Sequence, residues 1–113
     1  MLSKKIKWYL LFEDKSSLDD LFALRNTAVY KNYAGEFLLV KESEDYYAFQ
    51  NRCPHQNKPL NDCKLIDGHV VCPYHKYAFS CKDGRGQVLY LQKYQLRFDE
   101  NKVFIGLEKW SFF

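Results

Sequence analysis

Two short cysteine–histidine pairs are the residues of this 113-residue sequence whose types and spacing could do chemistry. Cys53 and His55 are two positions apart, Cys72 and His75 are three apart, and sixteen residues separate the pairs. With this spacing, each pair can present a thiolate and an imidazole from one loop toward a common centre. Two soft thiolates and two imidazoles suit an iron–sulfur cluster or zinc far better than calcium or magnesium. The sequence therefore predicts one metal centre formed by these four residues.

The residues flanking the four ligands follow a known pattern. Residues 51–55 and Leu60 resemble the first cluster loop of the Rieske [2Fe–2S] domain family. Residues 66–75 resemble the strand and loop of the second, and Phe79 and Gly84 resemble the aromatic residue and glycine that follow it. In that family two cysteines hold one iron and two histidines hold the other. The resemblance covers nearly the whole chain and implies one Rieske-type [2Fe–2S] cluster as cofactor.

The four residues also fit two other interpretations. A structural zinc site accepts two cysteines and two histidines, but it usually pairs cysteine with cysteine and histidine with histidine. Here each pair mixes the two residue types. Buried free thiols with incidental histidines would leave the paired spacing unexplained. We therefore favour the iron–sulfur cluster over both alternatives.

The remaining cysteines and histidine lie outside the ligand positions. We expect Cys81 to be a small buried hydrophobic residue. We favour the same role for Cys63, with a reactive thiol or a disulfide as the alternative. His69 is expected to be a packing or surface residue. High-potential family members brace their two loops with a disulfide, and the corresponding residues here are Lys58 and Tyr74, so the resemblance implies that this bridge is absent.

The resemblance also has an implication for the reduction potential of the cluster. High-potential members place a serine two residues after the second histidine, where its hydroxyl bonds a bridging sulfide. That position is Tyr77 here. Hydrogen bonds to the sulfurs, charge and exposure set the potential of Rieske centres within roughly −150 to +300 mV. Without the serine and the disulfide, we expect a potential near the low end.

The function implied is one-electron transfer without independent catalysis. Rieske oxygenases add a mononuclear iron site of two histidines and a carboxylate, but only His69 remains here once the cluster is assigned. No G-x-G-x-x-G element indicates a nicotinamide or flavin cofactor. The resemblance implies a ferredoxin that carries electrons from a flavin reductase to a terminal oxygenase or reductase.

Two alternative functions remain open. One is a small subunit resembling that of NAD(P)H nitrite reductase, although that family often loses the cluster ligands. The other is a redox-sensing cluster module. The segment 84–94 is short and lacks proline, whereas oxygenase ferredoxins commonly have a longer, proline-containing loop there. This difference leaves the partner open.

Composition and charge limit the class of protein. The length suits one domain, 1–113, and 47% hydrophobic and 18% aromatic residues can form a packed core. The net charge of +3 is mild and its basic residues are scattered, so we expect no nucleic-acid partner. The apolar run 8–12 is too short for a signal peptide, and no run approaches a membrane span. We expect a soluble, cytoplasmic protein.

The pattern of short apolar runs and turns predicts an all-β, Rieske-like antiparallel sandwich or barrel, with the two-loop cluster-binding subdomain inserted at about 51–86. The expected strands are 6–12, 27–30, 37–40, 46–49, 88–91, 94–98 and 103–105. A short helix is expected at 16–22, capped by Ser16 or Ser17.

Overall fold

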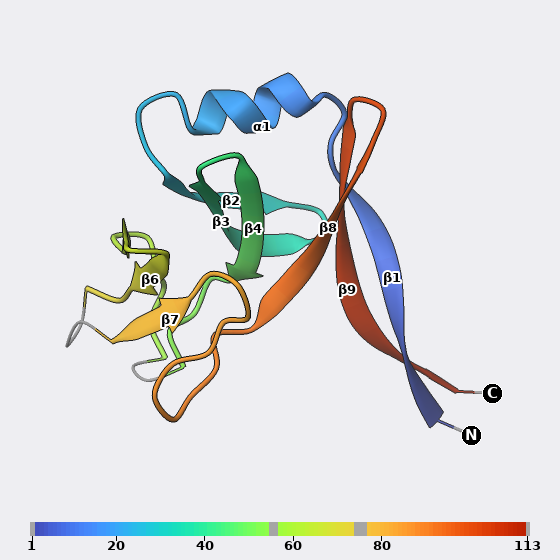
Figure 1. Ribbon diagram of the computed structural model, residues 1–113. Helices are drawn as coiled ribbons and strands as arrows, with labels where there is room; N and C mark the ends of the chain where they lie inside the picture. Colours follow the sequence, from blue (N-terminus) through green and yellow to red (C-terminus); the bar gives the residue numbers. More distant parts are fainter. Residues whose placement is uncertain (1, 55–56, 74–76, 113) are drawn as a thin grey trace.

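A computed structural model describes residues 2–54, 57–73 and 77–112, with side chains from Ser3 to Lys109 within these ranges. This part of the chain forms nine strands and one helix (Figure 1). In chain order they are β1 (Leu2–Phe12), α1 (Lys15–Leu21), β2 (Thr27–Asn32), β3 (Gly35–Glu42), β4 (Asp45–Gln50), β5 (Lys64–Ile66), β6 (His69–Val71), β7 (Ala78–Ser80), β8 (Lys93–Asp99) and β9 (Lys102–Phe112).

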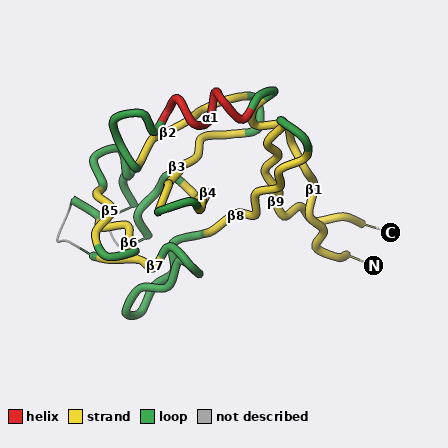
Figure 2. Tube along the Cα trace, turned by 45° about the horizontal axis from the view of Figure 1, so that its top comes forward, coloured by secondary structure: helices red, strands yellow, loops and turns green. Residues whose placement is uncertain are grey.

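The strands form two antiparallel sheets. The larger has the order β1-β9-β8-β4-β3-β2, and the smaller has the order β5-β6-β7. Figures 1 and 2 both place the small sheet at the end of the molecule opposite the chain termini. The small sheet and the loops around it are inserted in sequence between β4 and β8. The expected all-β antiparallel fold with an inserted subdomain is confirmed.

Strand β3 is central because both of its faces are buried. Leu38 and Val40 belong to a core that includes the cysteines, whereas Leu39 belongs to a second core beneath α1 and β9. The pairing with β4 keeps the two faces distinct, since Leu38 lies opposite Phe49 and Leu39 opposite Ala48. Successive side chains of a strand point to opposite faces. The continuous apolar run of β3 therefore serves two cores at once.

Helix α1 lies above β2–β4 in Figure 1 and covers the second core with Leu18, which is 1% exposed. The expected cap was wrong by two or three residues. The carboxylate of Asp14 accepts a hydrogen bond from the Ser16 N–H at 2.9 Å, so the helix begins at Lys15. Asp14 has the extended backbone that an N-cap needs, and its carboxylate is a strong acceptor for the free N–H groups of a first turn.

The strand expected at 88–91 is not formed. Residues 84–91 instead make a tight hairpin loop, in which Arg85 and Tyr90 form a single β-bridge. The chain turns at Gly84, whose φ of +78° lies in the left-handed region that favours glycine. The Leu91 N–H then donates to the Gly84 carbonyl at 2.7 Å, which closes the hairpin. This pairing within the loop leaves no partner strand for 88–91.

The three strands of the small sheet are three residues each. Such short segments carry too few residues to show an alternation in the sequence. In the described part of the chain, no helix has the length and apolar character that crossing a bilayer requires.

Candidate metal centre

The first cysteine begins a closed loop just after β4. The Cys53 N–H donates to the Lys58 carbonyl at 2.8 Å, and the Asn57 N–H donates to the Cys53 carbonyl at 2.6 Å. The buried Asn51 side chain holds the base of this loop by accepting a bond from the Leu60 N–H at 2.9 Å. A buried amide is stable only when it is bonded in this way. Cys53 is therefore fixed at the loop entrance with its side chain 0% exposed.

The second cysteine begins a loop of the same kind. Cys72 directly follows β6, and its N–H donates to the Tyr77 carbonyl at 2.8 Å. In both loops the cysteine N–H is bonded to a carbonyl five residues later. Cys72 is also 0% exposed, and it shares one core with Cys53. The tertiary structure thus brings the two predicted thiols to the same core from two matching loops.

The two predicted histidines lie within these loops in the sequence. His55 falls between Cys53 and Lys58, and His75 between Cys72 and Tyr77. Both histidines lie outside the described residues. Among the residues that are described, no group of three or more histidines, cysteines, aspartates or glutamates could hold a metal ion. The histidine half of the predicted ligand set therefore stays a prediction.

The donor set that the structure does describe fits an iron–sulfur cluster. Thiolates are the ligands that such clusters take, and both thiols lie in one core of buried apolar residues. A pocket of about 390 Å³ adjoins Cys72 and is lined by Val71, Pro73 and Ile66 with Asp62 and Lys64. Two buried thiols, one of them beside an opening to solvent, suit a centre that must be both sheltered and reachable.

The other two cysteines differ from this pair by their chemistry. Cys63 and Cys81 are free and buried, as expected. Burial raises the pKa of each thiol from 9.0 to about 11. A thiol with such a pKa is protonated and unreactive near neutral pH. The prediction that both are small buried hydrophobic residues is confirmed.

His69 lies on β6 with its side chain exposed, and its Nδ1 lies 2.8 Å from the Asp67 carbonyl oxygen. It is a surface residue, as expected.

Tyr77 is a residue whose role the sequence did not reveal. Its backbone carbonyl closes the Cys72 loop, and its hydroxyl accepts a hydrogen bond from the Val88 N–H at 2.9 Å. Its ring stacks on Phe79, with 4.9 Å between the ring centroids. Tyr77 therefore connects the second cysteine loop to the 84–91 hairpin. The sequence indicated Tyr77 only as the residue in place of the serine of high-potential members, and gave no signal of this connection.

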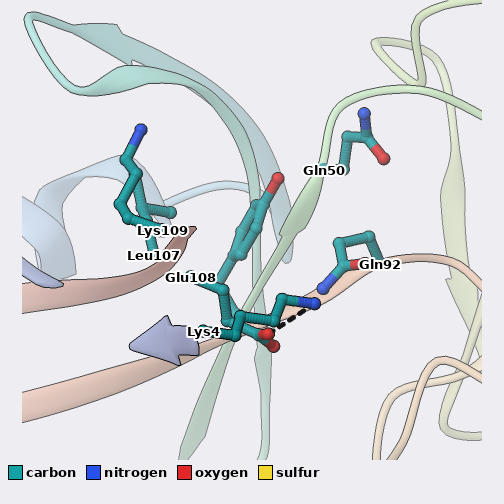
Figure 3. Close-up of a pocket in the computed structure, with 7 residues that line it drawn as sticks. Lys4, Gln50, Gln92, Leu107, Glu108 and Lys109 are labelled. Carbon is teal, nitrogen blue, oxygen red and sulfur yellow. Dashed lines mark ion pairs between the residues drawn. The ribbon is translucent and has the colours of Figure 1, made fainter. Parts of the chain in front are cut away.

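A separate pocket of about 330 Å³ lies between the β1–β9 ribbon and the junction of β4 with β8 (Figure 3). Lys4 and Glu108 form an ion pair of 2.7 Å in this pocket, and Gln50 and Gln92 lie across from them. Its described lining contains no cysteine or histidine. This described lining therefore offers no soft metal ligand.

Comparison with curated proteins finds relatives that include a ferredoxin and a much longer protein. The ferredoxin component of an alkene monooxygenase system from Xanthobacter autotrophicus is 32% identical over 101 residues, which are 86% of this chain and 82% of that protein. Human apoptosis-inducing factor 3 is 32% identical over 79 residues. The match spans 66% of this chain but only 13% of the length of that relative.

Among solved structures, a protein described as an NADH-dependent nitrite reductase small subunit from Mycobacterium tuberculosis has a TM-score of 0.72. The match covers 91% of this chain and 96% of that one at 17% identity, so it shows the shared fold.

The family model for the Rieske [2Fe–2S] domain matches residues 8–95. This range includes both cysteine loops, the small sheet and the hairpin. The two buried thiols and the identity to a ferredoxin over most of both chains agree with it. The chain therefore belongs to the Rieske [2Fe–2S] domain family, whose cofactor is one [2Fe–2S] cluster.

Proposed function

We propose that this chain is a Rieske-type ferredoxin, a one-electron carrier between a reductase and a terminal oxidoreductase, whose cluster is held by Cys53, His55, Cys72 and His75. The observation that carries the proposal is the pair of fully buried thiols at the entrances of two matching loops. The Rieske family model supports the cofactor, and the monooxygenase ferredoxin supports the role.

The protein's contribution is to hold and shelter the sulfur ligands. The cluster, when bound, supplies a centre that gains and loses one electron. Cys53 and Cys72 bind it from a core lined by Leu60, Val70 and Phe79, which excludes water from the thiolates. The loop hydrogen bonds fix both cysteine backbones, so little rearrangement accompanies a change of charge. We expect His55 and His75 to occupy the outer side, nearer to a docking partner.

The potential is proposed to lie near the low end of the Rieske range. The Tyr77 hydroxyl accepts a bond from the Val88 N–H, and its ring lies on Phe79, so this side chain is directed to the hairpin. None of the four cysteines is in a disulfide, so no disulfide braces the two loops. Position 77 has no serine to donate a hydroxyl hydrogen bond to a bridging sulfide. Loss of that bond stabilises the oxidised cluster relative to the reduced one, which lowers the potential.

The partners proposed are a flavin reductase and a terminal oxygenase or reductase, in the cytoplasm. The name of the Xanthobacter relative as the ferredoxin component of a monooxygenase system supports an oxygenase. A nitrite-reductase-like small subunit is the second candidate, favoured by the fold of the Mycobacterium protein. Retention of all four ligand positions favours the ferredoxin over that subunit.

The decisive experiment is electron paramagnetic resonance of the dithionite-reduced protein, with iron and acid-labile sulfide analysis. We expect a Rieske spectrum and two irons with two sulfides per chain. His55→Ala and His75→Ala should each abolish the spectrum, whereas the matched variant Cys81→Ala should retain it. A colourless protein that binds zinc instead would overturn the proposal.

The potential is tested separately by voltammetry on the purified protein. A midpoint near −150 mV, the low end of the range, is expected. A midpoint well above zero would contradict the role given to Tyr77 and the missing disulfide, while leaving the cluster itself intact.

A further inference from the structure

We propose that the 84–91 hairpin is a docking surface for an electron-transfer protein with an acidic face, contacted by Arg85, Val88 and Tyr90. This inference rests on the proposed function and adds to it the chemistry of the partner. Three independent features of the described residues support it: the hairpin is fixed in place, it exposes apolar side chains, and it lies in the part of the chain that carries the net positive charge.

The hairpin is held rigidly to the cysteine core. Backbone bonds join Leu91 to Gly84 at 2.7 Å and Gly86 to Leu89 at 2.8 Å. The Tyr77 hydroxyl accepts from the Val88 N–H at 2.9 Å, and this same residue closes the Cys72 loop. A surface fixed in this way loses little conformational entropy when a partner binds. The hairpin therefore presents a preformed contact beside the second ligand loop.

The outer face of the hairpin carries exposed apolar groups. Leu91 is 1% exposed, and Leu89 packs against the core that contains Cys53 and Cys72. The inner face of the hairpin is therefore packed on this core. Val88 is 83% exposed and Tyr90 is 59% exposed. Loop tips are usually polar, and tyrosine and arginine are enriched at protein interfaces. This exposure of rigid apolar side chains favours a contact surface.

The Arg85 side chain is held in place by Tyr90. Its guanidinium donates to the Tyr90 hydroxyl at 3.0 Å and lies 5.6 Å from the centroid of the Tyr90 ring. Asp83 accepts a bond from the Arg85 backbone N–H, so one carboxylate also lies at the base of the hairpin. The guanidinium itself is held by a neutral partner and remains exposed. It can therefore meet a carboxylate on another protein at little cost in side-chain entropy.

The net positive charge of the chain belongs to the segment that contains the hairpin. Residues 51–92 contain six basic and three acidic residues, and the rest of the chain contains eleven of each. The whole net charge of +3 thus belongs to the cluster-binding segment. Every charged residue of that segment that the structure describes is exposed. Complementary charge steers association and sets the register of docking, so the excess of basic side chains in this segment favours a partner with an acidic face.

The test uses flavodoxin, an acidic flavoprotein, as the partner probe. Binding of oxidised flavodoxin to the cluster-loaded protein is measured by thermophoresis at low and at high ionic strength, and electron transfer from its hydroquinone by stopped flow. The variants are Arg85→Gln and Val88→Ser. Lys102→Gln, at the start of β9, removes the same charge outside the hairpin.

Arg85→Gln should raise Kd by about threefold or more at low ionic strength, and the difference from wild type should shrink at high salt because screening weakens exposed charge pairs. Val88→Ser should raise Kd at both ionic strengths. Lys102→Gln should stay near wild type. None of the three should alter the paramagnetic spectrum or the midpoint potential.

Two results would overturn the docking proposal: Arg85→Gln and Val88→Ser changing Kd no more than Lys102→Gln, or tighter binding of the protein to anionic lipid vesicles or to duplex DNA than to flavodoxin. Either result with a normal Rieske spectrum leaves the proposed function standing. Absence of the spectrum in the wild-type protein would instead refute the proposed function.

Discussion

The four cysteines are all buried, so exposure does not distinguish the two proposed ligands from the other two. Their positions do. Cys53 and Cys72 each stand at the entrance of a loop whose backbone bond spans five residues, whereas Cys63 and Cys81 lie outside those loops. The latter pair keep a raised pKa because burial disfavours their thiolates. At the scale of single residues, loop position selects the ligands.

The raised pKa values predict how stability depends on pH in alkaline solution. In the unfolded chain these thiols ionise near 9.0, but in the folded protein they remain protonated up to about 11. The folded protein therefore holds these two protons more tightly than the unfolded chain does. The resulting contribution to the free energy of unfolding is complete below pH 9 and is lost as the pH rises toward 11. Urea denaturation between pH 8 and 11 should show a falling free energy of unfolding.

The variant Cys81→Ala provides the control for this pH dependence. It lacks one of the two raised thiols, so its free energy of unfolding should fall less steeply over the same interval. Equal slopes for the variant and the wild type would show that the Cys81 thiol does not titrate as described.

At the scale of elements, the hairpin 84–91 depends on one backbone position. Gly84 has a φ of +78°, and a Cβ added there would lie 2.1 Å from the Leu91 carbonyl oxygen. Backbone atoms cannot move aside as a flexible side chain can. The geometry that places Val88 and Tyr90 outward therefore requires glycine at this position.

Gly84→Ala should lower the free energy of unfolding by about 2–4 kcal/mol, because it combines a disfavoured φ with a clash against backbone. Gly68→Ala is the matched control. Gly68 also has a positive φ, +74°, but a Cβ there would meet the end of the Glu42 side chain at 2.8 Å, which can rotate away. Its loss should be only about 1 kcal/mol. Equal losses in urea titrations would contradict the role of the Leu91 contact.

At the scale of the whole molecule, two cores share one sheet. One core contains all four cysteines and the small sheet, and the other lies between the large sheet and α1. Strand β3 contributes to both. The first core holds the loops proposed to bind the cluster, so its stability should depend on the cluster, whereas the second should fold on apolar burial alone.

Removal of iron by a chelator under reducing conditions should therefore destabilise the first core more than the second. Backbone amides of β6 and β7 should exchange with solvent at least about tenfold faster in the iron-free protein, since binding energy is also folding energy for the loops. Amides of β9 should change little. Hydrogen exchange followed by mass spectrometry measures both sets. A uniform increase across all strands would show that the two cores unfold together.

Local patterns in the sequence were sufficient for several elements. The alternation from Ile6 to Phe12 lies within β1, and the apolar run 37–40 lies within β3. A strand with one buried face has apolar residues at every second position, and a strand with two buried faces has a continuous apolar run. The expected helix at 16–22 was correct to within one residue at either end. Its cap was not, because Ser16, Ser17 and Asp14 are all suitable capping types and only the backbone of Asp14 decides among them.

The sequence by itself determined the family, the cofactor and the two cysteines that the structure brings into one core, because ligand spacing along a loop is a local property. Only the tertiary structure decided the course of 84–91 and the link through Tyr77. The bond between the Tyr77 hydroxyl and Val88 joins residues eleven apart, and the hairpin closes through Gly84 and Leu91. Such contacts produce no periodic pattern of apolar residues in the sequence, since they depend on how the loops pack on one core.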